Sequence, residues 1–519
     1  MNNLRINNPI TGELLYEVTQ ASAAQVEQVY RDARHIQPQI AALTIQQRVR
    51  EMVKISDYLL AHQEEMLERL VRETGKTRFD ALSTELFEIC DLIDTYRDTT
   101  PRILADRKVH TPLVLMGKKS KVVFDPLGVV LVIVPWNYPL YQGLVPSLLA
   151  FLAGNAVILK PSENSPLQGM LESILEGAKF FPGAIQVVYG GREVGEMLVE
   201  AKPDKIHFTG SQRGGREVLQ AAARNLVPVD LELGGKDPAI VFEDVNIEKT
   251  ANGVVWAAFT HAGQSCTSIE RCYIHESIYT AFLAEVLRIV QNLRLSSSLE
   301  QSLQAGECDI GCLTVEFQAK IIEDQLKDAV EKGARVLTGG RREPGSLRFP
   351  PTVVVDLTPD MKLWTDETFG PVLPITQFKT EAEVIQQAND TPYGLSASVW
   401  SKDLRRAERV ARALQVGNVS INNHMLTEGN AALPFGGVKS SGFGRYKGEW
   451  GLLTFCNIKA IMLGPNDSAI EPHWYPQSAT KYEMLNQLSA ALFRRPRSWL
   501  KFLSAGMALT GQGNKEKIR

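Results

Sequence analysis

The chain has 519 residues, 44% apolar and 22% charged, which is ordinary globular usage and excludes disorder or a fibrous fold as its main state. A single hydrophobic core stops growing at roughly 250–300 residues, so we expect more than one domain. The net charge of −3, from 56 basic and 59 acidic residues, offers no basic field for a nucleic acid over the main body.

Apolar residues recur at helical spacing through the first ~110 residues, and the clearest amphipathic helix is predicted from Arg48 to Leu70. The residues at the N-terminus, 1–5, lack the apolar core of a secretory signal. The six cysteines contain no C-x-x-C pair of the kind that binds a metal. We therefore expect a cytoplasmic protein in a reducing compartment, without a metal site.

Segment 126–159 carries no charge but is interrupted by Pro-Trp-Asn-Tyr-Pro at 135–139 and Gly-Asn at 154–155. A membrane-spanning helix needs about 20 uninterrupted apolar residues, so we predict a buried strand, a loop, a buried helix and a second strand.

Strand-like runs of Val and Ile then alternate with helical patterns such as Pro166–Ala178 and Gly215–Arg224. This alternation predicts parallel sheets covered by helices on both faces, with a hinge near Leu233-Gly234-Gly235 between two α/β domains. The predicted strands are Val129–Val134, Ala156–Lys160, Ile185–Tyr189, Lys205–Thr209 and Val229–Glu232, then Ala239–Phe242, Arg271–Ile274, Thr352–Val355, Val372–Phe378 and Leu395–Trp400.

The C-terminal segment differs in charge from the rest. Residues 481–519 hold eight basic and two acidic side chains, a local charge of +6 that leaves −9 for the remainder. Trp499, Leu500, Leu503 and Met507 share one helical face, which predicts a basic amphipathic helix. Such a helix can lie on an anionic membrane, or it can dock on its own protein or a partner subunit, and we favour docking.

Three residues could carry chemistry, although each alone has an ordinary alternative. Cys266 lies in a Gly-Gln-Ser-Cys-Thr loop and could be a nucleophile or a buried structural cysteine. Glu232 ends an apolar strand before two glycines, where burial would suit it as a general base, unless it is an exposed charge. Asn137 follows the most clearly predicted strand, Val129–Val134, and could donate to an oxyanion or stabilise a turn.

Other residues follow predicted strands where a nucleotide could bind. Phe208-Thr209-Gly210-Ser211 leads from a strand through a glycine turn into a helix, although it is not the G-x-G-x-x-G pattern. Lys160 and Glu163 could hold ribose hydroxyls or form a surface ion pair.

Seven motifs, in order, resemble the NAD(P)-dependent aldehyde dehydrogenase superfamily from about Asn8 to Leu463. They are PWNYP at 135–139, LKPSE at 159–163, FTGS at 208–211, ELGGK at 232–236, GQSC at 263–266, ETFGP at 367–371 and PFGGVKSSGFGR at 434–445. The resemblance implies an α/β fold of two Rossmann-like parallel-sheet domains with a small β arm for oligomerisation. It divides the chain into a dinucleotide-binding domain (1–112 and 125–233), a catalytic domain (234–425), an arm with a bridging segment (113–124 and 426–464) and the extension 465–519.

The resemblance also implies roles for the residues in these motifs. Cys266 is expected to attack an aldehyde and give a thiohemiacetal, then a thioester once hydride has left for the nicotinamide. Asn137 and the Cys266 backbone N–H would form the oxyanion hole, and Glu232 would activate water for hydrolysis. The implied cofactor residues are Trp136, Lys160, Glu163, Gly210, Ser211, Glu367 and Phe369.

Two of these residues narrow the expected reaction. The Glu163 carboxylate would repel a 2′-phosphate, so we expect NAD, with NADP tolerated through Lys160. Because family members that transfer the acyl group to CoA generally lack the base at Glu232, we expect a free carboxylic acid as the product. The extension resembles that of a subgroup with some plant and fungal membrane-associated members and some bacterial semialdehyde dehydrogenases. The eukaryotic members carry an N-terminal hydrophobic anchor, which we do not expect here.

The substrate residues are the least constrained. Tyr141, Leu144, Thr267 and Met425 lie where family pockets vary, and they suggest an apolar or aromatic tunnel for a small-molecule aldehyde. A semialdehyde such as succinate semialdehyde is the alternative substrate. The rival functions are a Cys–His hydrolase using His261 or His424, and a non-catalytic binding protein. The resemblance further implies a homodimer or dimer of dimers, built through Leu113–Phe124 and Phe455–Leu463.

Overall fold

The computed structural model describes residues 3–115, 117–465 and 470–516. The chain divides into two compact units, which are treated separately below. The larger unit comprises residues 1–105 and 124–457, and the smaller comprises 106–123 and 458–519.

The first sheet of the larger unit has six strands in the order β17-β9-β8-β5-β6-β7. All neighbours are parallel except β17 and β9. Every side chain of β5 and β6 is buried, as expected for uninterrupted apolar strands covered on both faces. The strands are β5 Val129–Ile133, β6 Ala156–Lys160, β7 Ile185–Val187, β8 Lys205–Thr209, β9 Val229–Glu232 and β17 Gly442–Phe443.

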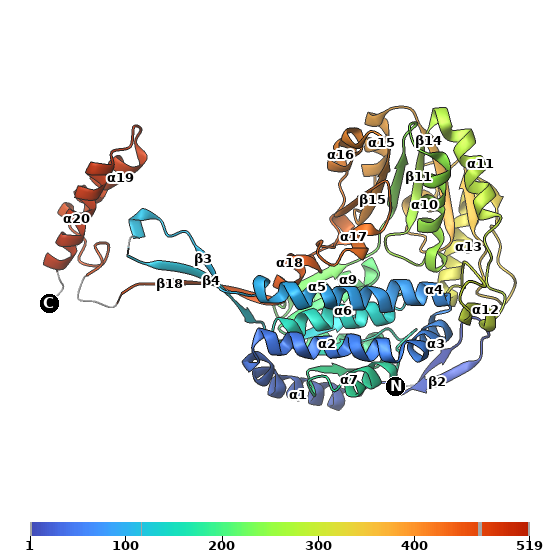
Figure 1. The fold of residues 1–519 in the computed structure, drawn as a ribbon, viewed down its shortest axis with the longest axis horizontal. Helices are drawn as coiled ribbons and strands as arrows, with labels where there is room; N and C mark the ends of the chain where they lie inside the picture. Colours follow the sequence, from blue (N-terminus) through green and yellow to red (C-terminus); the bar gives the residue numbers. More distant parts are fainter. Residues whose placement is uncertain (1–2, 116, 466–469, 517–519) are drawn as a thin grey trace. The chain divides into compact units, whose positions relative to one another are not determined.

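Helices cover this sheet. Helix α6 packs on β5 and β6 and is in turn covered by α2 and α5, while α1 packs on the same strands beside α8 (Figure 1). Helix α6 has no exposed residue, because it is sandwiched between the sheet and other helices. The helices are α1 Ala23–Ala42, α2 Ile45–Ala61, α3 Gln63–Thr74, α5 Phe87–Ile103, α6 Pro139–Leu152, α7 Met170–Gly177, α8 Arg192–Glu200 and α9 Gln212–Ala223.

The second sheet has seven strands in the order β12-β13-β14-β11-β10-β15-β16, and only β12 is antiparallel to its neighbour. Side chains of β11 alternate between two apolar clusters: Cys272 and Ile274 join one, and Tyr273 joins the other. The strands are β10 Asp237–Val241, β11 Ile269–His275, β12 Arg335–Thr338, β13 Thr352–Val355, β14 Val372–Phe378, β15 Ser396–Trp400 and β16 Asn418–Ile421.

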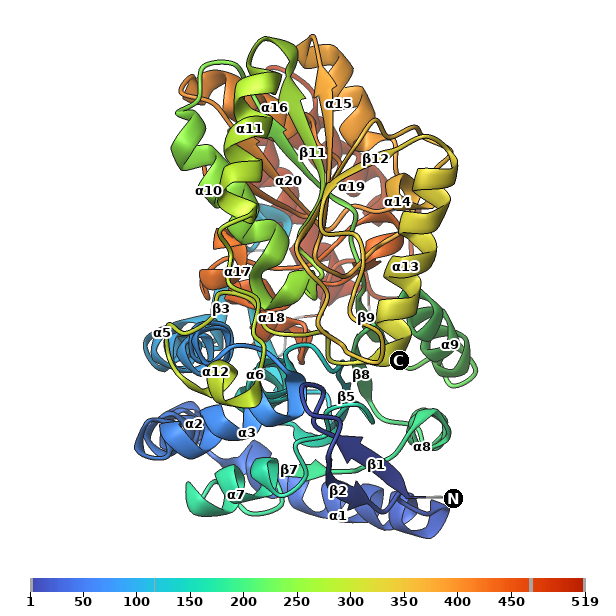
Figure 2. The same cartoon turned by 90° about the vertical axis from the view of Figure 1, so that its right-hand side faces the viewer.

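Helices flank this second sheet (Figure 2), and their residues contribute to the two clusters. Residues of α10, α11 and α13 belong to the first cluster, and residues of α15 and α16 belong to the second. A sheet with an apolar cluster on each face confirms the predicted α/β fold with helices on both faces. The helices are α10 Ile247–Phe259, α11 Tyr279–Val290, α13 Glu316–Glu331, α15 Glu381–Asn389 and α16 Leu404–Ala413.

Two predicted helices have different bounds. The helix expected over Arg48–Leu70 is interrupted at His62, whose backbone leaves helical geometry (φ −117°, ψ 24°) between α2 and α3. The helix expected from Pro166 begins only at Met170, because the preceding Gly169 has a left-handed backbone (φ 81°).

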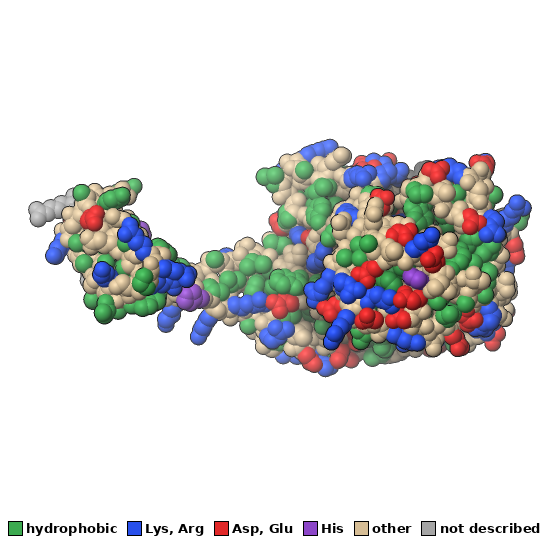
Figure 3. All heavy atoms as spheres, turned by 90° about the horizontal axis from the view of Figure 1, so that it is seen from above, with side chains coloured by type: hydrophobic (Ala, Val, Ile, Leu, Met, Phe, Trp, Pro, Cys, Tyr) green, Lys and Arg blue, Asp and Glu red, His purple; other side chains and the backbone are tan. Residues whose placement is uncertain are grey.

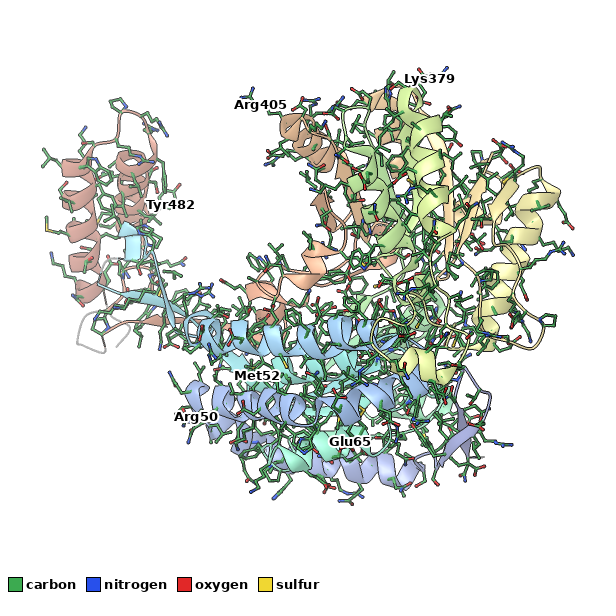
Figure 4. The ribbon with its side chains drawn as sticks, turned by 45° about the vertical axis from the view of Figure 1, so that its right-hand side comes forward. Arg50, Met52, Glu65, Lys379, Arg405 and Tyr482 are labelled. Atoms are coloured by element: carbon green, nitrogen blue, oxygen red, sulfur yellow. The ribbon has the colours of Figure 1, made fainter. Side chains whose placement is uncertain are left out.

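The smaller unit holds a three-stranded sheet in the order β18-β4-β3 and two C-terminal helices, α19 and α20, which lie side by side (Figure 4). The arm expected at 113–124 is only partly a strand, since 113–115 form a 3₁₀ turn and β4 begins at Lys119. None of the described helices is long and apolar enough to cross a bilayer. The elements are β3 Arg107–Val109, β4 Lys119–Pro126, β18 Cys456–Leu463, α19 Ala479–Phe493 and α20 Trp499–Lys515.

Candidate active site

The parallel strands of the first sheet end at one edge, where open α/β sheets bind ligands. The loop at 135–139 follows β5, Lys160 ends β6, Gly210 follows β8 and Glu232 ends β9. The predicted motifs therefore meet because the strands that precede them are neighbours.

A cavity of ≈ 1010 Å³ opens at this edge within the larger unit. It extends from β6 and the start of α9 to the loop of Cys266. Its lining includes every residue that the sequence predicted for catalysis or cofactor binding: Trp136, Asn137, Lys160, Glu163, Gly210, Ser211, Glu232, Cys266, Glu367 and Phe369.

One end of the cavity has the groups that a dinucleotide needs. Ser211 caps α9 by accepting a hydrogen bond from the Gly214 N–H, so the positive end of this helix lies at the cavity. The buried Lys160 ammonium donates to the Pro161 carbonyl at 3.1 Å and lies 3.6 Å from the Glu163 carboxylate. A helix N-terminus with an adjacent cation and carboxylate fits the pyrophosphate and ribose hydroxyls of NAD(P).

A buried ion pair holds the loop of Glu367 and Phe369 against this cavity. The Lys236 ammonium donates to the Glu270 carboxylate at 2.7 Å, and Glu270 accepts the backbone N–H of Phe369 at 2.8 Å. Phe369 is thereby held at φ +51°, a costly backbone for a residue other than glycine, with its ring 5.5 Å from that of Trp136. Glu367 accepts the Gly235 N–H at 3.2 Å, and burial raises the pKa of Glu367 to about 8.

A second buried ion pair holds the loop of Asn137. The Lys76 ammonium donates to the Glu85 carboxylate and, at 3.0 Å, to the Asn137 carbonyl oxygen. The other Glu85 oxygen accepts the N–H groups of Leu140 at 2.8 Å and Tyr141 at 3.0 Å, at the start of α6. Both side chains of the pair are fully buried, and together they hold the chain at Asn137 and at the start of α6.

The Cys266 loop lies against Asn137 and the end of β9. The Asn137 side-chain amide donates to the Gln264 carbonyl at 2.9 Å, two residues before the cysteine. A Cβ at Gly235 would lie 2.7 Å from the Cys266 carbonyl oxygen, so only glycine permits this approach. The cysteine itself is a free, half-buried thiol on the cavity wall.

The surroundings of Cys266 favour the neutral thiol. Burial raises its pKa well above the ordinary value of 9.0, and nearby carboxylates, including Glu428, Asp237 and Glu367, raise it further. Attack by this sulfur therefore requires a group that takes its proton as the bond to carbon forms.

Glu232 has the properties of a general base. The residue is 3% exposed, and neither carboxylate oxygen has a hydrogen-bond partner among the described residues. Burial raises the pKa of Glu232 well above 4.5, and Asp230 raises it further, against the opposing effect of Arg445 and Lys447. A carboxylate whose pKa is moved toward neutrality, on the wall of a cavity, can take and return a proton.

Neither histidine of the rival hydrolase is arranged as a base for Cys266. The His424 Nε2 is 2.6 Å from the Thr267 carbonyl oxygen, and burial lowers the pKa of His424 to about 4. His261 is fully buried with both ring nitrogens unpartnered among the described residues, and burial holds its pKa well below 6.5. Groups of three or more residues able to hold a metal are likewise absent from the described part of the chain.

The predicted substrate residues lie outside the cavity lining. Leu144 and Thr267 are fully buried, Tyr141 is 8% exposed, and Met425 is half-buried with φ +60°. Their contact with a substrate stays a prediction.

Sequence reasoning missed a charged cluster near the thiol. Lys447 is 1% exposed, donates to the Glu428 carbonyl oxygen and lies 5.4 Å from the centre of the Phe435 ring. Burial lowers its pKa, while the carboxylates of Glu428, Glu88 and Glu232 and the Cys266 thiol raise it. These acidic residues lie far apart in sequence and follow no shared motif, so only the folded chain shows that they meet.

The comparisons with known proteins agree with this geometry. The model of the "Aldehyde dehydrogenase family" matches residues 2–461. The 4,4'-diapolycopene aldehyde oxidase of a Methylomonas species is 37% identical over 478 residues, 92% of this chain and 88% of that protein. Mitochondrial succinate-semialdehyde dehydrogenase of Oryza sativa is 34% identical, over 89% of this chain and 86% of that protein.

Among solved structures, a point mutant of betaine aldehyde dehydrogenase from Staphylococcus aureus in complex with NAD+ is 29% identical with a TM-score of 0.84. The match covers 92% of this chain and 96% of that one. The chain therefore belongs to the aldehyde dehydrogenase family and is an oxidoreductase with that family's α/β fold.

Proposed function

We propose that the protein oxidises an aldehyde to a carboxylic acid with NAD(P)+, through a thioester on Cys266. The observation that carries this proposal is the single cavity lined by Cys266, Asn137 and Glu232 together with the residues suited to a dinucleotide. When bound, NAD(P)+ supplies the acceptor for the hydride that leaves the substrate carbon.

The first step forms the bond between the Cys266 sulfur and the aldehyde carbon. The thiol proton passes to Glu232, whose carboxylate is unpartnered and basic enough to receive it. The Asn137 amide and the Cys266 backbone N–H stabilise the oxyanion that develops. Departure of the hydride then converts this carbon into a thioester.

The second step hydrolyses the thioester. Glu232, returned to its carboxylate form, takes a proton from water while the oxygen attacks the thioester carbon. The carbon–sulfur bond breaks, Cys266 leaves as the thiolate and is protonated, and the product is a free carboxylic acid. Overall, one aldehyde, one water and one NAD(P)+ give a carboxylate, NAD(P)H and two protons.

The two buried ion pairs position the residues for this chemistry. Lys76 and Glu85 fix the loop that presents Asn137, and Lys236 and Glu270 fix the loop of Phe369. Preorganised donors stabilise an oxyanion without paying for reorientation during the reaction.

We propose NAD as the preferred cofactor and NADP as tolerated. The Glu163 carboxylate lies 3.6 Å from the Lys160 ammonium, so it compensates this cation and would repel a 2′-phosphate. The NAD+ complex of the Staphylococcus aureus relative is consistent with this choice.

We propose an apolar or aromatic aldehyde as the substrate. Two aromatic residues interact electrostatically with Cys266, the half-buried Tyr138 and the buried Tyr446, and the Methylomonas relative is named for 4,4'-diapolycopene aldehyde. The alternative, a semialdehyde, is favoured by the Oryza relative. A semialdehyde fits less well, because its distal carboxylate would need a cation to bind. Lys447, a buried cation near Cys266, already interacts with the carboxylates of Glu428 and Glu88.

The remaining assignments are also proposals. We retain the division into a dinucleotide-binding domain (1–112 and 125–233), a catalytic domain (234–425) and an arm (113–124 and 426–464). The protein would form a homodimer or dimer of dimers through this arm. Six free thiols support a cytoplasmic, reducing location.

A panel of aldehydes tests the reaction and the substrate class together. The panel pairs linear alkanals and aromatic aldehydes with semialdehydes of matching length, and NADH or NADPH formation is followed by absorbance. We expect turnover without CoA, highest kcat/KM for the apolar members and none for Cys266→Ser. Turnover by Cys266→Ser, a requirement for CoA, or hydrolysis without nicotinamide would refute the mechanism.

A further inference from the structure

The C-terminal helices α19 and α20 form a hairpin whose inner face is packed and whose outer face is not. Ala491 of α19 and Phe502 and Leu509 of α20 are 6–7% exposed, so the helices have a small apolar core of their own. Ser478 caps α19 by accepting from the Lys481 N–H, and Ser498 begins the turn into α20. In Figure 4 the two helices lie side by side, with Tyr482 labelled.

The outer face of α20 exposes large apolar side chains. Trp499, Leu500, Leu503 and Met507 are 49%, 84%, 47% and 70% exposed. At about 100° per residue these four fall within an arc of about 100°, centred about 120° away from the inward-facing Phe502 and Leu509. Phe493, at the end of α19, is a further large apolar side chain that is 71% exposed. A stripe of this kind is unusual for a surface that meets only water.

A cluster of cations borders this stripe. Arg494, Arg495 and Arg497 form the turn between the helices, next to Trp499 in sequence, whereas Lys501 lies about 150° around α20 from the centre of the stripe. None of the four has an ion-pair partner among the described residues. By contrast, Arg342 of the larger unit pairs with two glutamates, Glu316 and Glu323. Figure 3 shows basic and apolar side chains side by side on the hairpin.

We propose that this hairpin binds the surface of an anionic lipid bilayer, and not a partner subunit as the sequence alone favoured. The apolar stripe of α20 would enter the boundary between headgroups and acyl chains, and the arginines of the turn would pair with lipid phosphates. The hairpin lies on the membrane and does not cross it, since no described helix is long and apolar enough to span.

The positive charge of the hairpin favours a lipid surface over a second copy of the hairpin as its partner. Residues 481–519 carry a net +6, so two such surfaces repel each other, whereas an anionic bilayer attracts both. Each basic residue near an anionic surface contributes about 1 kcal/mol, a factor of about five in binding. This inference does not depend on the proposed reaction, because it concerns the smaller unit alone.

Vesicle sedimentation of the full-length protein tests the proposal. We expect at least tenfold stronger binding to phosphatidylcholine vesicles containing 30% phosphatidylglycerol than to phosphatidylcholine alone, reversed by 0.5 M NaCl. The apolar variant Leu500→Ser/Leu503→Ser/Met507→Ser and the charge variant Arg494→Gln/Arg495→Gln/Arg497→Gln should each lose at least tenfold. The matched control Leu404→Ser/Arg405→Gln, on the exposed face of α16, should bind as the original chain does.

Light scattering separates the lipid surface from a partner subunit, and circular dichroism checks that each variant is folded. We expect an unchanged oligomeric state in both hairpin variants. Equal binding to both vesicle types, folded variants that bind as the original chain does, or variants that dissociate the oligomer without affecting vesicle binding would overturn the proposal.

Discussion

The buried pair of Lys76 and Glu85 allows a quantitative test of how the oxyanion loop is held. Substitution Lys76→Met removes the ammonium that donates to Glu85 and to the Asn137 carbonyl oxygen. Both charges are fully buried, so the substitution leaves the Glu85 carboxylate without a counter-ion. Breaking a buried pair in this way costs about 3–5 kcal/mol, and we expect this loss in the free energy of unfolding.

The double variant Lys76→Met/Glu85→Gln separates charge from hydrogen bonding. Glutamine removes the unpaired charge but keeps a carbonyl oxygen for the N–H groups of Leu140 and Tyr141. We therefore expect most of the lost stability to return. The Asn137 carbonyl still lacks its donor, so we expect kcat to stay at least tenfold below that of the original chain, part of the 10²–10³ that one oxyanion donor supplies.

Urea unfolding, followed by fluorescence at one fixed protein concentration, measures the free energy of unfolding. Steady-state kinetics measures kcat. The matched control is Lys54→Met, which breaks the partly exposed pair with Glu51 and should cost less than about 1 kcal/mol. A Lys76→Met protein within 1 kcal/mol of the original, or a double variant no more stable than the single one, would contradict the reasoning.

Three further predictions concern the cavity. Because burial raises the pKa of Glu232, thioester hydrolysis in single-turnover mixing should fall as pH decreases through a midpoint well above 4.5; a midpoint near 4.5 would be contrary evidence. Substitution Glu163→Gln should raise the ratio of kcat/KM for NADP over NAD about fivefold, from about 1 kcal/mol of relieved repulsion at this partly exposed position, whereas Glu193→Gln on α8 should leave it unchanged. Substitution Asn137→Ala should lower kcat about 10²–10³-fold, and a smaller effect than fivefold would exclude its role in the oxyanion hole.

Much of the fold is encoded in local patterns of the sequence. The runs Val129–Ile133 and Ala156–Lys160 are apolar at every position except the terminal lysine, and both form fully buried parallel strands. Residues that follow such strands meet at one edge of the sheet, which is why Asn137, Gly210 and Glu232 could be predicted to share a site.

The supports of that site could not be predicted in the same way. Glu270 is a charged residue within the strand β11. Its partner Lys236 comes 34 residues earlier in the sequence, with helix α10 between them. Lys76 holds the Asn137 carbonyl across 61 residues of chain. These contacts depend on how the elements pack, and a buried charge has no local pattern that marks it as buried. The break at His62 was missed for a related reason, since the apolar spacing continues through it.

The most direct test of the central claim uses Glu232→Gln with an accepted aldehyde and NAD+. Because Glu232 takes both the thiol proton and a proton of the attacking water, NADH should form more slowly in this variant and stop at one equivalent. Mass spectrometry of the same sample should find one acyl group on Cys266. Sustained turnover at the original rate, or an NADH burst without an acyl group on Cys266, would contradict the account.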